Sequence, residues 1–481
     1  MADPRPAPAT AVHVTRTMAD WAALLRYEDL PPEVVTEAKR FLLDSVACAL
    51  GGLVQRDVQI MLEVLDEIAG RGSATVLGTG LRTDPLSATL ANSLMIRALD
   101  YNDIYWKQDP SHPSDLIPAA MACTERNAGS GRDLIVGIVL GHEFEQRLCE
   151  AAFPGIREVG WHHATLTAVA APIVAGRMLD LSAEQIQNAI GISASRHCTP
   201  GSVTAGKLTM MKNTVDPLAV QSGVMAALLA EKGYTGPEHV LDGKEGFSHV
   251  FPTHWRFDVL TDGLGESWRI LQCGMKSFPT EALTHAPISA VLDLVREHDL
   301  APGDIQEVRI RSLARAADIL ADPSKYDPLT RETADHSLPY CVAAAIVDRK
   351  VTPEQFTRER IMDPLVRSQL PKVKVIADKE IEALFPELQR VHVTVVTGAG
   401  RELTLQLDYP KGDPRNPMTD QELDEKFDAL AAGVCSSARV AEMKVALRRT
   451  EQFAQLTDLM AALTADRYGA ACGDRATPDS D

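Results

Sequence analysis

Apolar residues recur at helical spacing through the first half of the chain. The clearest run covers residues 32–51, where apolar side chains return every three or four positions until Gly51 and Gly52 end it. Helices that are apolar on nearly every side are expected inside a large bundle. Such runs predict further helices at residues 58–69, 87–99, 116–127, 132–151, 163–178, 182–195, 216–232 and 288–297.

The spacing of apolar and polar residues changes after Cys273, from a helical period to a strand-like alternation. Residues 305–311, 390–396 and 402–407 alternate between apolar and polar side chains, which predicts half-buried strands, and Gly398-Ala-Gly400 predicts a hairpin turn between the last two. Helical runs between these strands, and a return to amphipathic helix afterwards, lie at residues 337–347, 353–356, 363–370 and 419–463. The predicted fold class is mainly α, with a large all-helical domain and a smaller α+β domain.

The same changes of pattern place the domain boundaries. The helical domain is expected to begin with residues 13–272, the α+β domain to cover 273–410, and helices within 411–465 to rejoin the helical domain. Residues 1–12 and 466–481 are poor in apolar periodicity and are expected to be disordered tails.

Composition and charge exclude several classes of function. The 481 residues carry 48 Lys and Arg against 66 Asp and Glu, a net charge of −18, which argues against nucleic acid or an anionic membrane as the main partner. No uncharged apolar run is long enough to cross a membrane. The eight cysteines show no Cys-x-x-Cys spacing, so no metal is expected, and the N-terminus does not resemble a signal peptide. A cytoplasmic location is the simplest expectation.

The stretch from Asp100 to Asp115 contains four acids, three aromatic residues and one histidine between two apolar runs. Pro110 and Pro113 restrict the backbone around His112. Ser114 is a candidate N-cap, which would place His112 against the N-terminus of a helix, where an anion is favoured. An ordinary polar loop between two helices would explain the same residues.

Other candidate residues are scattered along the chain. His162 and His163 are adjacent imidazoles at the start of a predicted helix, Lys212 precedes another, and Lys276 lies at the predicted domain boundary. His336 and Tyr340, four residues apart, would project from one face of a helix. Each residue also has a structural explanation, such as a satisfied core histidine or a lysine whose stem covers apolar surface. Together these groups suit proton transfer on a polycarboxylate without a cofactor.

Several motifs resemble those of the MmgE/PrpD family, which includes 2-methylcitrate dehydratase and cis-aconitate decarboxylase. The resemblance covers about residues 17–460, and its motifs occur in the family's order. They are Leu43-Asp-Ser-Val-Ala-Cys-Ala-Leu-Gly51, Leu99-Asp-Tyr-Asn-Asp103, His112-Pro-Ser-Asp115, Met211-Lys212, Lys276-Ser-Phe-Pro279 and Arg331-Glu-Thr-Ala-Asp-His-Ser-Leu-Pro-Tyr340.

The resemblance implies a homodimer with a large helical domain, a smaller α+β lid and a cofactor-free active site between the two domains. It implies a hydro-lyase that dehydrates a 2-methylcitrate-like tricarboxylate, as in propionate catabolism. Carried over by position, the implied catalytic residues are Asp100, His112, His163 (or His162), Lys212, Lys276 and Tyr340. Residues expected to help bind substrate are Asn102, Ser114, His162 and His336.

Chemistry assigns expected roles to these residues. Lys212 and Lys276 would hold carboxylates and stabilise the enediolate-like anion formed when a proton leaves the carbon next to a carboxylate. His163 is the first choice as general base, because an imidazole titrates near neutral pH. Tyr340 or His112 would protonate the departing hydroxyl, and Asp100 would orient an imidazole or bind the substrate hydroxyl.

Two departures from the family pattern leave alternatives open. Ile104 stands where the family commonly has threonine, and Val215 replaces a histidine typical of the decarboxylases. Loss of a hydroxyl from the site can change the substrate. The same apparatus could decarboxylate cis-aconitate or epimerise a dicarboxylate, and a catalytically inactive polycarboxylate-binding paralogue is an alternative from another class.

Overall fold

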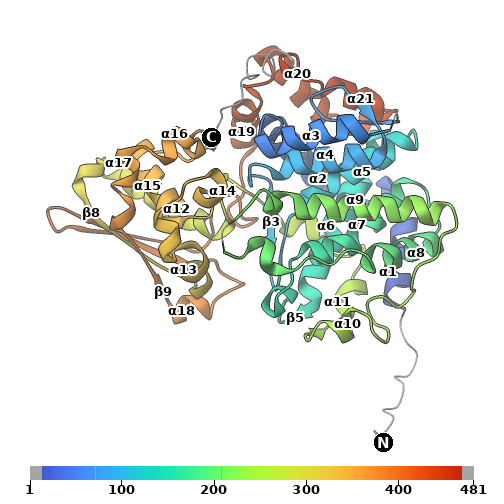
Figure 1. The fold of residues 1–481 in the computed structure, drawn as a ribbon, viewed down its shortest axis with the longest axis horizontal. Coiled ribbons are helices and arrows are strands. Elements are labelled where there is room, and N and C mark those ends of the chain that lie inside the picture. The colour runs from blue at the N-terminus through green and yellow to red at the C-terminus, as the bar shows by residue number, and fades with distance from the viewer. Residues whose placement is uncertain (1–12, 71, 207, 469–481) are drawn as a thin grey trace, which may run out of the picture.

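A computed structural model describes residues 13–70, 72–206 and 208–468. Figure 1 shows two lobes side by side, a larger helical lobe and a smaller lobe of helices and strands, each with its own hydrophobic core. The predicted fold class, mainly α with a smaller α+β domain, is confirmed. The expected tail at 1–12 and most of that at 466–481 lie outside the described residues.

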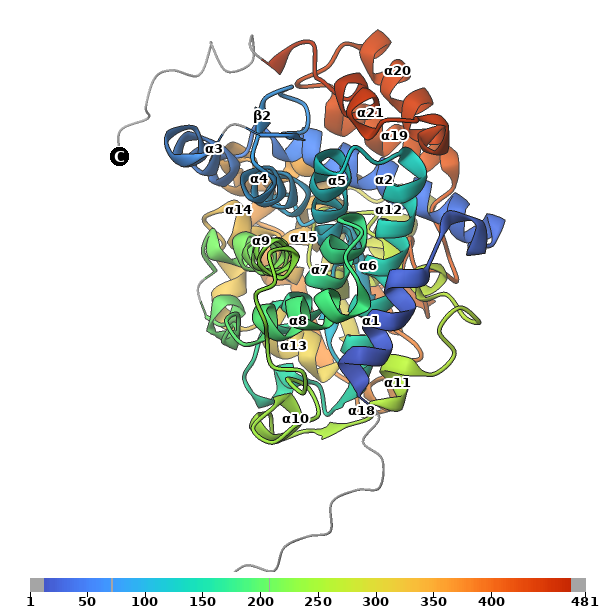
Figure 2. The ribbon, with the colours of Figure 1, turned by 90° about the vertical axis from the view of Figure 1, so that its right-hand side faces the viewer.

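The larger lobe, the helical domain, packs its helices around α7. Figure 2 shows α7 in the middle of the bundle, and α5, α6, α8 and α9 contact it directly. These helices are apolar on most faces, as expected where helices are covered on every side. The main helices of this domain are α1 (Val14–Leu24), α2 (Pro32–Gly52), α3 (Arg56–Ile68), α4 (Pro85–Arg97), α5 (Ile117–Arg126), α6 (Gly131–Ala151), α7 (Ala164–Met178), α8 (Ala183–Ala194) and α9 (Met211–Glu231).

Two helices differ from the sequence prediction. The first helix, α1, precedes the first predicted helix, at residues 32–51, and buries Met18, Ala19 and Ala22. Helix α9 begins at Met211 rather than at residue 216. Proline favours the first turn of a helix, so Pro217 indicated a later start, but the helix continues through it. Lys212 therefore lies in the first turn of α9 instead of preceding the helix.

Short elements complete the helical domain. A three-stranded sheet, in the order β4-β3-β7, lies beside the candidate site and is antiparallel throughout. Its strands are β3 (Asp103–Trp106), β4 (Pro110–Ser111) and β7 (Gly274–Met275). Two strand pairs and two one-turn helices lie elsewhere in the domain: β1 (Ala74–Thr75), β2 (Arg82–Thr83), β5 (Ala152–Phe153), β6 (His254–Trp255), α10 (Phe247–Val250) and α11 (Asp258–Thr261).

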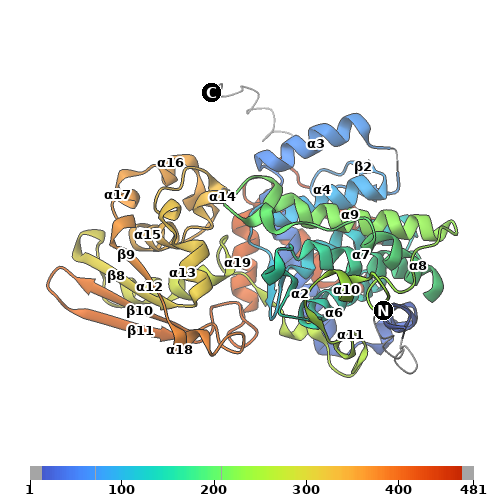
Figure 3. The same ribbon diagram turned by 60° about the horizontal axis from the view of Figure 1, so that its bottom comes forward.

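The smaller lobe, which we call the lid, is built on a four-stranded sheet in the order β11-β10-β8-β9. Strand β10 pairs antiparallel with β8 and β11, whereas β9 pairs parallel with β8 at the edge. Helices α12 and α15 cover one face of the sheet (Figure 3). The strands are β8 (Ile305–Ser312), β9 (Val373–Ala377), β10 (Val391–Thr397) and β11 (Glu402–Leu407).

Strand β9 was not predicted from the sequence. This edge strand is largely exposed after Val373, so its side chains show no clear alternation of apolar and polar residues. The predicted helix at 353–356 is a 3₁₀ turn, and that at 363–370 is a single α-helical turn. The lid helices are α12 (His285–Glu297), α13 (Ala314–Leu320), α14 (Arg331–Ala334), α15 (Leu338–Asp348), α16 (Arg358–Ile361), α17 (Pro364–Arg367) and α18 (Lys379–Glu382).

The chain returns from the lid to pack its last helices in the core of the helical domain. Helix α19 contacts α2 and stands between the two lobes in Figure 3. From α19, the buried Lys426 ammonium pairs with Asp44 at 2.6 Å and donates hydrogen bonds to the carbonyls of Tyr101 and Lys276. The three helices are α19 (Asp420–Ala431), α20 (Ser437–Arg448) and α21 (Leu456–Ala462). Lys426 thereby holds together the segment before β3 and the segment after β7, which both contribute residues to the candidate site.

Among the described helices, none combines the length and apolar character needed to cross a membrane.

Candidate active site

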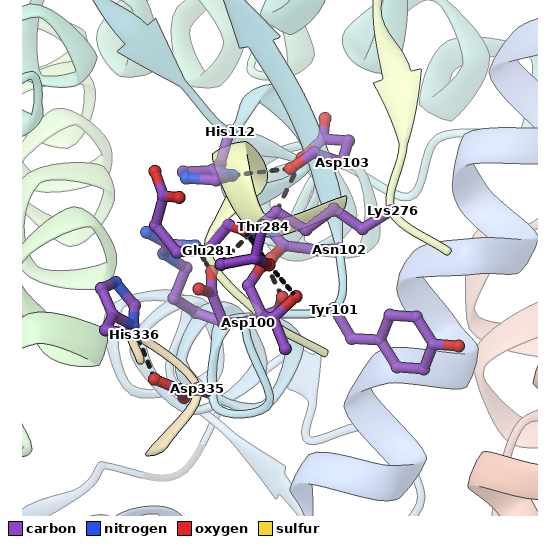
Figure 4. A network of polar contacts seen from close by, with 12 residues as sticks. Asp100, Tyr101, Asn102, Asp103, His112, Lys276, Glu281, Thr284, Asp335 and His336 are labelled. Carbon is purple, nitrogen blue, oxygen red and sulfur yellow. Dashed lines mark hydrogen bonds and ion pairs between the residues drawn. The ribbon is translucent and has the colours of Figure 1, made fainter. Parts of the chain in front are cut away.

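The site is centred on the carboxylate of Asp100, which follows α4. Its backbone is left-handed, with φ of 50°, a conformation that aspartate tolerates better than most residues. The carboxylate forms ion pairs with three cations: Arg97 Nη1 at 2.8 Å, Lys276 Nζ at 2.8 Å and Lys212 Nζ at 3.1 Å. Figure 4 shows Asp100 and Lys276 of this network. Burial alone would raise the pKa of Asp100, but Lys212, Lys276 and Arg97 together hold it well below its usual value.

Lys276 and Lys212 differ in how many of their ammonium protons already have hydrogen-bond acceptors within the protein. Lys276 donates to the Asp100 carboxylate, to the Asp100 carbonyl at 3.2 Å and to the Thr280 carbonyl at 3.0 Å, so all three of its protons have acceptors. Lys212 Nζ is buried and ion-paired with Asp100, yet makes no well-directed hydrogen bond to a described residue. Lys212 therefore keeps donors for a bound anion, whereas Lys276 mainly positions Asp100 and adds positive charge.

The tautomer of His112 follows from its hydrogen bond. Its Nδ1 lies 2.6 Å from the backbone carbonyl of Asp103, which can only accept, so Nδ1 carries the proton. The neutral imidazole then has its lone pair on Nε2. Burial lowers the pKa of His112 well below its usual value, with the nearby cations Arg97 and Lys276 adding to the shift. His112 is therefore a neutral base.

Asn102 and Ser114 form hydrogen bonds within the segment 102–114 that carries His112. The Ser114 amide and hydroxyl donate to the Asp103 carboxylate at 2.8 and 2.6 Å, and the Asn102 amide donates to the Ser114 hydroxyl at 2.9 Å. Ser114 sits within a 3₁₀ turn, Pro113–Leu116, before α5, so its prediction as an N-cap was wrong. Neither residue lines the cavity described below, and we place both in a supporting layer.

The adjacent histidines have different environments. His162 Nδ1 accepts a hydrogen bond from the Ala164 amide at 3.2 Å, so neutral His162 carries its proton on Nε2, and burial lowers its pKa well below the usual value. His163 Nε2 lies 3.2 Å from Asp216 Oδ1. Burial would raise the pKa of Asp216, but the charge of His163 lowers it instead. His162 is a neutral donor, and His163 forms an imidazole–carboxylate pair.

Several of these groups line a cavity of about 70 Å³ between the helical domain and the lid. Of the residues predicted from the sequence, the structure places seven on its wall: Asp100, His112, His162, His163, Lys212, Lys276 and His336. Wall residues that the sequence analysis missed include Arg97, Arg157, Glu281 and Lys325. The spacing of Arg97 three residues before Asp100 on a helix could have revealed it. The other three come from loops and the lid, where spacing carries no such information.

Tyr340 does not reach this cavity. Its side chain is fully buried in the lid core against Phe356, and its hydroxyl donates to the carbonyl of Gln355. The prediction that His336 and Tyr340 share a helix face fails because α15 begins at Leu338, after His336. The structure thus offers no support for Tyr340 as a proton donor, and we leave it out of the site.

Two buried groups near the cavity have side chains of metal-binding type. They are His162, His163 and Asp216, and Asp103, His142 and Cys273, and in each the donor atoms lie within 4.8 Å of one another. The Asp103 carboxylate is already engaged by Ser114, which makes the second group a poor site. The first group offers two imidazoles and one carboxylate, which are ligand types found in zinc sites, so a chelator belongs in any activity assay.

A helical domain and an α+β lid that enclose lysines, histidines and one shared aspartate define a two-domain protein with a cavity suited to anions. Sequence models of the MmgE/PrpD N-terminal and C-terminal domains match residues 16–260 and 278–452. The chain therefore belongs to the MmgE/PrpD family, as its motifs indicated.

Similar proteins include both decarboxylases and dehydratases. The chain is 26% identical to the cis-aconitate decarboxylase-like protein oryM of Aspergillus oryzae, over 94% of this chain and 98% of that protein. It is 26% identical to human cis-aconitate decarboxylase, over 88% and 89% of the two chains. It is 25% identical to 2-methylcitrate dehydratase of Salmonella typhi, over 82% and 84%. The relatives are enzymes, and at this identity they leave the specific reaction open.

Proposed function

We propose that this protein is a lyase that removes water from a 2-methylcitrate-like tricarboxylate without a cofactor. The observation that carries the proposal is the neutral His112, which has its lone pair on Nε2 and lines a cavity together with Arg97, Lys212 and Lys276. Such an elimination requires a base to remove the proton and positive charge to stabilise the resulting anion.

The first step is removal of a proton from the carbon next to a carboxylate. His112 suits this role better than His163, our expectation from the sequence, because His163 Nε2 already lies 3.2 Å from the Asp216 carboxylate as an ion pair. The anion that develops on the substrate carboxylate would be stabilised by Lys212, whose donors are not taken by well-directed hydrogen bonds among the described residues. His162 Nε2–H adds a neutral donor, and His163 with Asp216 helps to orient the substrate.

A second candidate reaction is decarboxylation of cis-aconitate or a similar acid. Similarity to decarboxylases over 94% of this chain favours it. The cations would again stabilise the carbanion, but no C–H proton would have to be removed before carbon dioxide leaves. The base at His112 would then have no role in the first step, and we therefore rank dehydration higher.

Proton NMR of the purified protein with 2-methylcitrate, citrate and cis-aconitate, with and without a chelator, tests the proposal. We expect an olefinic product from methylcitrate at the same rate with chelator. Release of carbon dioxide from cis-aconitate would instead support the second candidate, and solvent deuterium incorporation without net reaction would indicate an epimerase. Binding without any turnover would indicate the inactive paralogue. The homodimer and the cytoplasmic location stay predictions.

Ile104 provides a test of substrate specificity. Its side chain lines the cavity where the family commonly has threonine. We expect Ile104→Thr to change the ratio of kcat/KM for 2-methylcitrate and citrate by about tenfold, because a hydroxyl in the wall binds polar substrate groups and an apolar one does not.

Ile104→Val is the matched control, since valine has the shape of threonine without the hydroxyl. An unchanged ratio in Ile104→Thr, or the same change in both variants, would show that the hydroxyl at this position does not set specificity.

A further inference from the structure

The lid contributes its own titratable groups to the cavity wall. Glu281 and His336 both line it, and the buried Asp335 carboxylate lies 2.5 Å from His336 Nδ1. Figure 4 shows Glu281 and His336 on the same side of the network as Asp100 and His112. The base at His112 comes from the helical domain and this group comes from the lid, so both domains contribute to the wall of one cavity.

We propose that Glu281 is the acid that protonates the departing hydroxyl, with His336 and Asp335 as the pair that returns a proton to it. This inference rests on the proposed dehydration. Elimination expels a hydroxyl, which is a poor leaving group unless an acid protonates it as the carbon–oxygen bond breaks. Tyr340, expected from the sequence to do this, lies in the lid core with its hydroxyl bonded to Gln355.

The hydrogen bonds of Glu281 show which oxygen is available. The Leu283 amide donates to Oε2 at 2.7 Å, so in the neutral acid Oε2 is the accepting oxygen and the proton sits on Oε1. No hydrogen bond joins Oε1 to another described residue. The Glu281 amide donates to the Asp335 carbonyl at 3.1 Å, which fixes the segment next to the His336 pair.

The environment of Glu281 favours the protonated form that an acid needs. Burial raises its pKa above the usual value, against the opposing charges of His336, Lys276 and Arg157. A bound polycarboxylate adds negative charge beside Glu281, which raises the pKa of the carboxyl further. Lys276, one of these opposing charges, is itself ion-paired with Asp100 at 2.8 Å.

The proposed step balances. His112 takes the proton from carbon, the C–H electron pair forms the double bond, and the carbon–oxygen bond breaks toward the hydroxyl. Glu281 gives its proton to that oxygen, so water leaves and the carboxylate remains. His336, held at Nδ1 by Asp335, then passes a proton to Glu281 and regains one from solvent, while His112 returns its proton to solvent.

Glu281→Gln tests the inference, because glutamine keeps the shape and an accepting oxygen but cannot transfer a proton. We expect kcat with 2-methylcitrate to fall by about 10²–10⁴-fold, the usual contribution of a general acid. With an analogue that carries fluorine in place of the hydroxyl, fluoride release should fall less than about tenfold, because fluoride leaves without a proton. Glu354→Gln, an exposed lid glutamate paired with Lys350, is the matched control and should leave both rates unchanged.

The outcomes separate this inference from the proposed function. Wild-type protein that releases neither water nor fluoride overturns the proposed dehydration, and the role of Glu281 falls with it. Wild-type activity with an equally active Glu281→Gln variant, or with equal losses on both substrates, overturns only the role of Glu281 as an acid.

Discussion

Replacement of Lys276 with methionine is expected to lower kcat/KM by about 10²–10³-fold, the usual loss when one group that stabilises a developing anion is removed. The lysine donates all three of its protons to Asp100 and Thr280 and is 2% exposed. Without it, the Asp100 carboxylate retains only Arg97 and Lys212 as ion-pair partners. Lys212 would then be held more tightly by Asp100 and less available to the substrate.

The same substitution should also lower stability. Removing one partner of a buried ion pair typically costs about 3–5 kcal/mol, and the two remaining cations on Asp100 should keep the loss near the lower figure. Urea unfolding and steady-state kinetics measure the two effects. Lys411→Met is the control, because Lys411 is partly exposed and pairs only with Glu422. Full activity in Lys276→Met would remove this lysine from the site.

His112→Asn is expected to lower kcat by about 10²–10⁴-fold, the usual contribution of a general base. The asparagine amide can still donate to the Asp103 carbonyl, so the loop should keep its conformation. His163→Asn should cost less, because in our assignment that imidazole orients the substrate. A larger loss in His163→Asn than in His112→Asn would reverse the assignment of the base.

The pH dependence gives a second readout for His112. A base must be unprotonated to act, so activity persists as pH falls until the pH reaches the pKa of that base. Because burial lowers the pKa of His112, kcat/KM of the wild-type protein should hold at pH values below the ordinary histidine pKa of about 6.5. A loss of kcat/KM centred near that ordinary value would argue that an unperturbed histidine is the base.

The local pattern of the chain was sufficient to predict most of the long helices of the helical domain and the hairpin of the lid. Runs such as residues 32–51 are long and strongly periodic, and burial of their apolar faces outweighs other local preferences. The prediction failed where that periodicity is weak or contradicted. Strand β9 is mostly exposed, and Pro217 lies inside α9 although its chemistry favours a helix start.

The sequence by itself determined the helical architecture, the family and the inventory of lysines, histidines and acids. Only the tertiary structure decided how each group is placed and hydrogen-bonded, and our proposed roles rest on those orientations. The Asp103 carbonyl accepts the Nδ1 proton of His112, which leaves the lone pair on Nε2. The Leu283 amide donates to Oε2 of Glu281, which leaves Oε1 without that bond. Tyr340, although part of a family motif, is turned into the lid core. These orientations arise from contacts between segments far apart in the chain, which spacing along a sequence does not encode.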